Sequence, residues 1–84
     1  MCIAVFSSRT NTLMIYAQLQ KFGVDCKVIN MPSQLGGNCT ICIQFMHCDL
    51  KKLRYIINRV NARYLVNIYK LKIENNCRKY VVIV

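Results

Sequence analysis

Apolar residues along this chain follow the two-residue period of strands in some segments and the three- to four-residue period of helices in others. Residues 1–6 are an apolar run that predicts a central strand with both faces buried. Side chains alternate along a strand, so Ile3 and Val5 would point to one face of the sheet. The other residues of the run, expected on the face without helices, are Cys2, Ala4 and Phe6.

A cluster of helix-capping residues from Ser7 to Asn11 precedes a helical pattern that runs to Phe22. The apolar positions of this pattern recur at i, i+3, i+7 and i+10 and form one stripe: Thr12, Ile15, Leu19 and Phe22. Gly23 stands where a glycine commonly ends a helix in left-handed backbone angles. The sequence therefore predicts a first helix that ends before residue 24.

Two strands follow, separated by a turn-rich connection. Residues 24–31 predict a second strand whose polar interruptions are typical of a sheet edge. Pro32 has no N–H group for a ladder hydrogen bond and should end this strand. Residues 39–46 predict a third strand in which Cys42 and Met46 lie on the face without helices. The residues expected to pack beneath the helices are Ile41, Ile43 and Phe45.

The second half of the chain again has the order strand, helix, strand. Asp49 is a good N-cap for a helix that reaches about residue 61. Its apolar stripe is Leu50, Leu53, Ile57 and Val60. Residues 64–74 predict a fourth strand, and Asn75-Asn76 predicts a turn because asparagine tolerates left-handed angles. Residues 77–84 predict a fifth strand, which must pair with this sheet or with that of a neighbour.

This order of elements predicts a single α+β domain over residues 1–84. The simplest arrangement is a ferredoxin-like βαββαβ two-layer sandwich with an extra C-terminal strand, in which the first and third strands lie in the middle of an antiparallel sheet. The chain has 84 residues, which is enough for one domain. Its composition is 55% hydrophobic, which leaves more apolar surface than a small core can bury. We therefore expect a homo-oligomer, most simply a homodimer.

The formal net charge of +9, from twelve Lys and Arg against three Asp and Glu, has two interpretations. One is an anionic partner, and the other is a solvated basic surface without a partner. The basic residues are dispersed, and no basic run of about five to eight residues is present. The predicted middle strands also lack the aromatic residues on which RNA-recognition sheets stack bases. Nucleic-acid binding is thus not expected, whereas an acidic partner stays open.

The chain contains six cysteines, an unusually large number for its length. The first residues do not form a signal peptide, and no apolar run reaches the about 20 residues of a membrane helix. We therefore expect a cytoplasmic protein without membrane attachment, in which the thiols are reduced.

Cys39 is the candidate for chemistry, because it stands where a glycine-rich turn becomes a strand. Successive N–H groups in such a turn can bind an anion and favour the reactive thiolate. The candidate binding residues around it are Gly36, Gly37, Asn38 and Thr40. The alternative, that Cys39 is a half-buried cysteine with a purely structural role, stays open because cysteine often simply packs.

Cys39 and Cys42 have the C-x-x-C spacing of redox pairs, but the predicted strand separates them. Residues three apart on a strand point to opposite faces and lie about 10 Å apart, whereas a disulfide needs Cα atoms within about 7 Å. His47 and Cys48 are adjacent, which does not fit the spacing of zinc ligands. The sequence predicts no metal and no cofactor, and without a catalytic motif it favours a carrier or binding protein over an enzyme.

Several segments between about residues 3 and 71 carry a family resemblance. They are Phe6-Ser7-Ser8, Phe22-Gly23-Val24, Val28-Ile29-Asn30-Met31-Pro32, Cys39, Ile43-Gln44-Phe45 and Asp49-Leu50. Together they resemble a small bacterial family of selenium/sulfur carrier protein-like domains of unknown function. Two departures are Gly36-Gly37, where Ser-Ser is usual, and Thr40, where glycine is usual.

The resemblance implies a sulfur or selenium carrier that holds a persulfide on Cys39 and meets a sulfur-donor or acceptor protein. The alternative function is a non-catalytic, homo-oligomeric protein-binding module with a basic surface. It is favoured by the surplus of apolar residues and by the positive charge.

Overall fold

The computed structural model describes residues 1–35, 41–60, 63 and 65–83 of the chain. In this part, five antiparallel strands and two α-helices form a mixed α+β fold, as the sequence predicted. The strands are β1 (Cys2–Phe6), β2 (Cys26–Asn30), β3 (Ile41–Phe45), β4 (Leu65–Glu74) and β5 (Cys77–Val82). The helices are α1 (Arg9–Lys21) and α2 (Leu50–Val60), with 3-10 turns η1 (Ser33–Leu35) and η2 (His47–Asp49).

The strands are arranged in the order β2-β3-β1-β4-β5. β1 and β3 lie inside the sheet, and β2 lies at an edge, as predicted. β5 pairs with β4 in the same sheet through a turn at Asn75 and Asn76, whose φ angles are +51° and +64°. These positive values confirm the left-handed turn expected from the two asparagines.

α1 begins and ends with the residues that the sequence indicated. The Ser8 side chain accepts a hydrogen bond from the Asn11 N–H group at 3.1 Å, and Gly23 has a φ of +73° just after the helix. Of the predicted stripe, Thr12, Ile15 and Leu19 are buried. Phe22, expected in the same stripe, is instead 49% exposed. It is the C-cap residue, directly after the end of the helix at Lys21.

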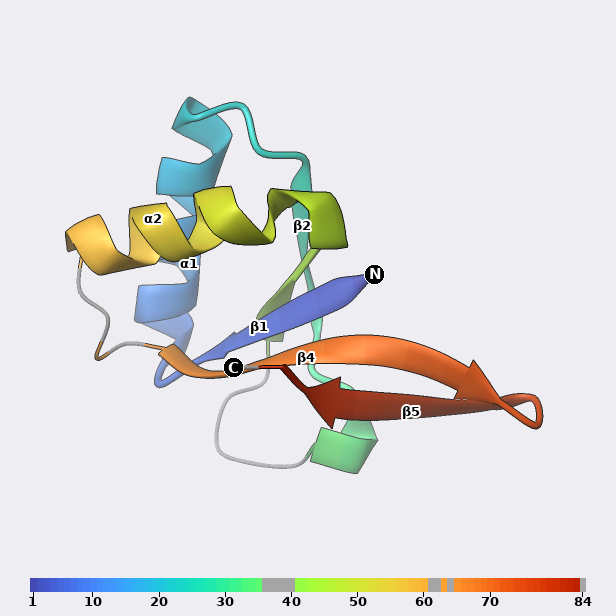
Figure 1. Ribbon diagram of the computed structural model, residues 1–84. Coiled ribbons are helices and arrows are strands. Elements are labelled where there is room, and N and C mark those ends of the chain that lie inside the picture. Colours follow the sequence, from blue (N-terminus) through green and yellow to red (C-terminus); the bar gives the residue numbers. More distant parts are fainter. Residues whose placement is uncertain (36–40, 61–62, 64, 84) are drawn as a thin grey trace.

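The main core lies between the two helices and one face of the sheet (Figure 1). α2 contributes Leu53, Ile56 and Ile57 to this core, while Leu50 and Val60 pack at its margin. α2 starts directly after Asp49, as expected. The Arg54 guanidinium also donates a hydrogen bond to the Ile83 carbonyl oxygen at 3.4 Å, which connects α2 to the end of β5.

The prediction for the two faces of β1 was wrong. Cys2, Ala4 and Phe6 lie beneath the helices in the main core, whereas Ile3 and Val5 lie on the opposite face. The register explains this result, because Cys2 pairs with Phe45 and Ala4 with Ile43. Directly opposite residues of an antiparallel pair share one face. The even-numbered residues of β1 therefore lie on the same face as the odd-numbered residues of β3.

The prediction for β3 was correct in part. Ile43 and Phe45 belong to the main core, and Cys42 is buried on the opposite face, as expected. Met46 follows the end of β3 and is 49% exposed, so it contributes to neither face of the strand. None of the described helices is long and apolar enough to span a membrane.

Candidate functional site

The connection from β2 to β3 begins with residues that the structure describes. β2 ends at Asn30, and η1 forms directly after Pro32. The Leu35 N–H group donates to the Pro32 carbonyl oxygen at 3.1 Å, closing the short turn. Proline suits this position because its own ring nitrogen has no hydrogen to donate to the ladder that ends here.

η1 is attached to the sheet face opposite the helices. Ile3, Val5 and Cys42 form a second buried cluster on that face. The residues that pack against this cluster are Ile29, Met31, Leu35, Tyr69 and Tyr80. In Figure 1, η1 lies on the other side of the sheet from α1 and α2. The connection therefore starts from a fixed point on the face without helices.

The far end of the connection is also fixed. β3 begins at Ile41, which pairs with Asn30, and the next pair joins Ile29 and Cys42. Ile41 is itself 9% exposed. Both ends of the segment between Leu35 and Ile41 are thus held by packing or by the β2–β3 ladder.

The predicted site residues themselves lie outside the described residues. These are Cys39 and the four candidate binding residues Gly36, Gly37, Asn38 and Thr40. Their predicted roles remain predictions, as does the absence of a disulfide between Cys39 and Cys42.

The described cysteines fall into two groups. Cys2, Cys26 and Cys42 are buried, with exposed fractions of 0%, 7% and 0%, while Cys48 and Cys77 are exposed. Burial raises the pKa of the Cys2 thiol above its ordinary value. Burial, followed by the nearby carboxylates of Asp25 and Asp49, also raises the pKa of Cys26. Removal from water disfavours the thiolate, so these two thiols are poor nucleophiles.

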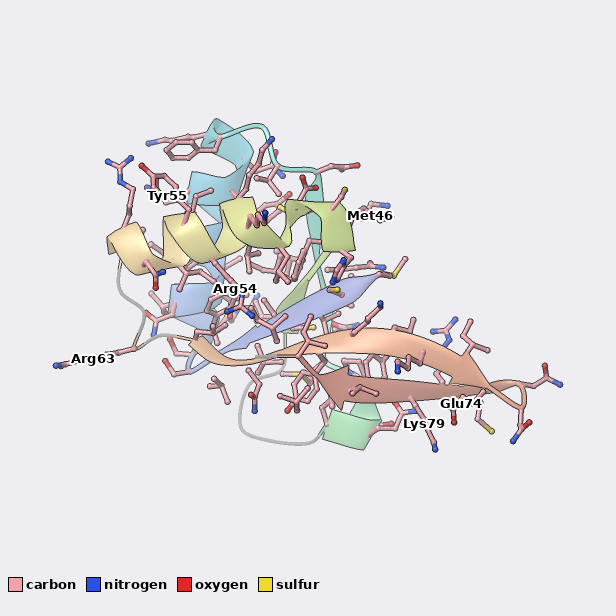
Figure 2. The ribbon with its side chains drawn as sticks, in the orientation of Figure 1. Met46, Arg54, Tyr55, Arg63, Glu74 and Lys79 are labelled. Atoms are coloured by element: carbon pink, nitrogen blue, oxygen red, sulfur yellow. The ribbon has the colours of Figure 1, made fainter. Side chains whose placement is uncertain are left out.

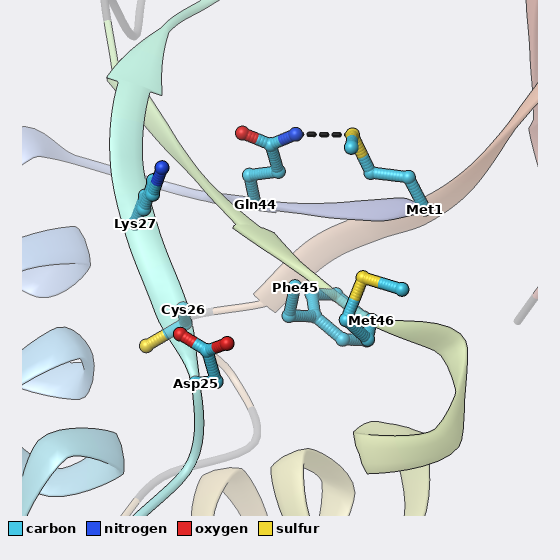
Figure 3. Close-up of a pocket in the computed structure, with 7 residues that line it drawn as sticks. All are labelled: Met1, Asp25, Cys26, Lys27, Gln44, Phe45 and Met46. Carbon is cyan, nitrogen blue, oxygen red and sulfur yellow. Dashed lines mark hydrogen bonds between the residues drawn. The ribbon is translucent and has the colours of Figure 1, made fainter.

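A small cavity of about 190 Å³ lies at the start of β2, at the opposite end of the β2–β3 pair from the connection (Figure 3). Its lining residues are Met1, Asp25, Cys26, Lys27, Gln44, Phe45 and Met46. In Figure 3 the Cys26 sulfur points away from Met1 and Met46, and it accepts a weak hydrogen bond from the Gln20 amide at 4.0 Å. The Gln44 amide donates a hydrogen bond to the Met1 sulfur. The three sulfur atoms do not converge on a common point.

Metal-binding side chains do not cluster in the part of the chain that the structure describes. There, no group of three or more His, Cys, Asp or Glu residues is placed to hold a metal ion. His47 and Cys48 belong to η2, whereas Cys42 is buried on the sheet face opposite the helices.

The sequence-based interpretation missed a cluster of positively charged residues on the β4–β5 hairpin. Lys72 lies directly opposite Lys79, and Ile73 lies opposite Arg78. The signal was present in the sequence. A two-residue turn at Asn75-Asn76 pairs residue 74 with residue 77, and counting outward from that pair brings the two lysines together. The charges that looked dispersed along the chain therefore meet across the ladder.

Comparison with known proteins gives one family. The family model described as "Putative Se/S carrier protein-like" matches residues 1–70. The match includes β1 to β3, both helices, the connection with Cys39 and the first part of β4, while β5 lies outside it. No curated protein and no solved structure matches the chain significantly.

Proposed function

The chain belongs to this Se/S carrier protein-like family, and from that membership we propose that it carries sulfur or selenium on Cys39. The carried atom would be held as a persulfide or as its selenium analogue. The observation that supports Cys39 most strongly is the burial of three of the other thiols. Within the matched residues, Cys2, Cys26 and Cys42 are each at most 7% exposed.

A carrier thiol must reach the sulfur atom of another protein. The thiolate is the attacking species, so burial prevents both contact and ionisation. Among the described cysteines of the matched region, this argument leaves Cys48, which is exposed on η2. Cys48 is therefore the natural control for Cys39.

The proposed loading step needs no added oxidant. The Cys39 thiolate attacks the outer sulfur of a donor cysteine persulfide, R–S–SH. A new bond forms between the Cys39 sulfur and the outer sulfur, and the donor S–S bond breaks. The donor leaves as a thiolate, and the transferred sulfur keeps its proton. Delivery to an acceptor thiol is the same exchange in the opposite sense.

The connection around Cys39 supports this step through its anchored ends. Leu35 packs on the sheet, and Ile41 is held in the β2–β3 ladder. We propose that Gly36, Gly37, Asn38 and Thr40 supply backbone N–H groups to the charged sulfur, because consecutive N–H groups in a turn can bind an anion.

A loading assay tests the proposal. The protein is incubated with a cysteine desulfurase and cysteine, and its intact mass is measured without reductant. We expect a gain of one sulfur atom that is lost on reduction, absent in Cys39→Ser and retained in Cys48→Ser. Equal loading of the wild type and Cys39→Ser would contradict the proposal.

Two further predictions stay proposals. We propose self-association, which the exposed apolar residues Val66, Ile73 and Val82 support, with exposed fractions of 55%, 72% and 50%. Light scattering that reports the mass of one chain at all concentrations would exclude it. We also propose a ferredoxin-like layout for β1 to β4, supported by their order β2-β3-β1-β4, with β5 added at one edge.

A further inference from the structure

The β4–β5 hairpin projects beyond the rest of the sheet (Figure 1). β1 pairs with β4 only as far as Lys70, and the Leu71 N–H group donates to the Met1 carbonyl oxygen at 2.9 Å. Past this point, the described ladder contains only two strands. Residues 72–79 make up this two-stranded end of the hairpin.

The register shows which backbone groups of β5 face outward. The Ile83 N–H group donates to the Ile68 carbonyl oxygen at 3.0 Å, so Ile83 points toward β4. Along an antiparallel strand, the N–H and C=O groups of alternate residues point to opposite sides. The residues whose backbone groups point away from β4 are therefore Arg78, Tyr80 and Val82.

The direction of Leu71 confirms this assignment. Leu71 pairs with Tyr80, yet its N–H group bonds Met1 on the other side of β4. Leu71 and Tyr80 therefore form a pair whose backbone groups point away from each other. Because β5 is the last strand of the described sheet, three residues of β5 offer donors and acceptors along its outer edge.

The hairpin next to this outer edge is strongly basic. Lys72 and Lys79 lie directly opposite each other, and Arg78 follows on the other face. Like charges in such a pair destabilise a sheet. Glu74 compensates in part, because its carboxylate lies 3.2 Å from the Lys79 ammonium at the end of the hairpin (Figure 2). Both side chains of this pair are more than half exposed, so the ion pair stabilises little.

Apolar side chains lie beside these charges. Val81 is 38% exposed and Val82 is 50% exposed. A phosphate backbone needs cations but no aliphatic partners, whereas a protein segment uses both. Basic residues on an edge strand also discourage aggregation, which is the competing explanation of the same charges.

We propose that the outer edge of β5 binds an extended acidic segment of another protein as a sixth strand. The backbone of Arg78, Tyr80 and Val82 would hydrogen-bond the added strand, as in other cases of strand addition. Two adjacent carboxylates would face Arg78 and Lys79, and an aliphatic stretch would lie beside Val81 and Val82. The proposal does not depend on the carrier function.

A synthetic peptide of this pattern serves as the probe. The sequence Thr-Glu-Glu-Val-Ile-Val-Thr and its reverse cover both strand directions, and a Lys-Lys version is the control for charge. Peptide titration is followed by amide shifts of the full chain and by fluorescence anisotropy. We expect shifts and slower hydrogen exchange centred on Arg78, Tyr80 and Val82, with binding that weakens as salt increases.

Three variants separate backbone pairing from charge. Val82→Pro removes an outward N–H group but no hydrogen bond to β4, so the chain stays folded while peptide affinity falls about tenfold. Val82→Thr keeps that N–H group and should bind like the wild type. Arg78→Glu with Lys79→Glu should abolish binding of the acidic peptide and confer binding of its Lys-Lys version.

Four results would overturn the proposal. The first is no binding of either acidic peptide at about millimolar concentration, which would leave protection against aggregation as the role of the charges. The second is binding that Val82→Pro and the charge reversal leave unchanged. The third is the same set of shifts with a single-stranded RNA oligonucleotide and not with the peptide. The last is shifts of the β5 amides that grow with protein concentration alone, which would assign the edge to a second copy of the chain.

Discussion

Because three thiols are buried, we expect a thiol reagent to label them much more slowly than the exposed thiols. Cys2 lies in the main core with Leu53, and both side chains are 0% exposed. A thiol reagent can reach Cys2 only after the protein opens. At roughly 0.05–0.15 kcal/mol of stability per residue, an 84-residue domain has about 4–13 kcal/mol against unfolding. Cys2 should therefore react at least about a thousandfold more slowly than exposed Cys48.

Leu53→Ala tests whether this protection comes from the core. Truncating a fully buried leucine costs about 2–5 kcal/mol. Because each 1.4 kcal/mol is about a factor of ten, labelling of Cys2 should become about thirtyfold to several thousandfold faster. The rate at Cys48 should not change, because this thiol is exposed in the folded protein.

The assay is pulsed alkylation at neutral pH, followed by peptide mass mapping of all six cysteines. Urea unfolding measures the loss of stability in the same samples. Leu53→Ala could lower the free energy of unfolding and leave the labelling rate of Cys2 at its wild-type value. The reagent would then reach Cys2 by local opening, and burial would no longer exclude Cys2 as the carrier thiol. The rate at Cys39, compared with Cys48 in the same experiment, then reports whether the connection activates its thiol.

Three further outcomes follow from the fold. Ser8→Ala removes the side-chain acceptor for the Asn11 N–H group and should lower the stability by about 1 kcal/mol. Thermal unfolding would show this loss as a lower Tm, and Ser8→Asp, which again offers an acceptor, should have the wild-type Tm. Asn76→Val places a β-branched residue at a φ of +64° and should lower the free energy of unfolding in urea by about 1–2 kcal/mol. Asn76→Gly should be tolerated, and equal stability of the two variants would contradict the left-handed conformation of residue 76. The pKa values of Cys2 and Cys26 are raised, so the folded state holds these thiol protons more tightly than the unfolded chain does. The protonated thiols therefore stabilise the folded state below about pH 8.5, and this stabilisation is lost as the pH rises further. Urea unfolding across this range should show the decline, and Cys26→Ala should make it shallower.

Periodicity predicted the elements well because the local signals agree with the tertiary structure. The α2 stripe of Leu53 and Ile57 is buried, and the Asn75-Asn76 turn has the expected angles. Each of these signals lies within one element and its caps. The helices, the strands and their order in the chain could therefore be predicted from the residues alone.

The faces of β1 could not be predicted in the same way. All five residues of β1 are buried, so its composition contains no contrast between an inner and an outer face. Only the pairing with β3, 35 or more residues later, decides that Cys2 lies beneath the helices. The candidate site is inferred from the sequence, because Cys39 lies outside the described residues. The structure supports it indirectly, through the anchored residues on either side of the connection and through the burial of Cys2, Cys26 and Cys42.

The central position of β1 has a consequence for folding during synthesis. Its two neighbours in the sheet, β3 and β4, come from residues 41–45 and 65–74. As the chain emerges from the ribosome, β1 is made before both of them, and its backbone has no partner on one side until β4 has left the exit tunnel. Loop closure between such distant segments slows folding. We therefore expect the sheet around β1 to be completed only after the residues of β4 are available.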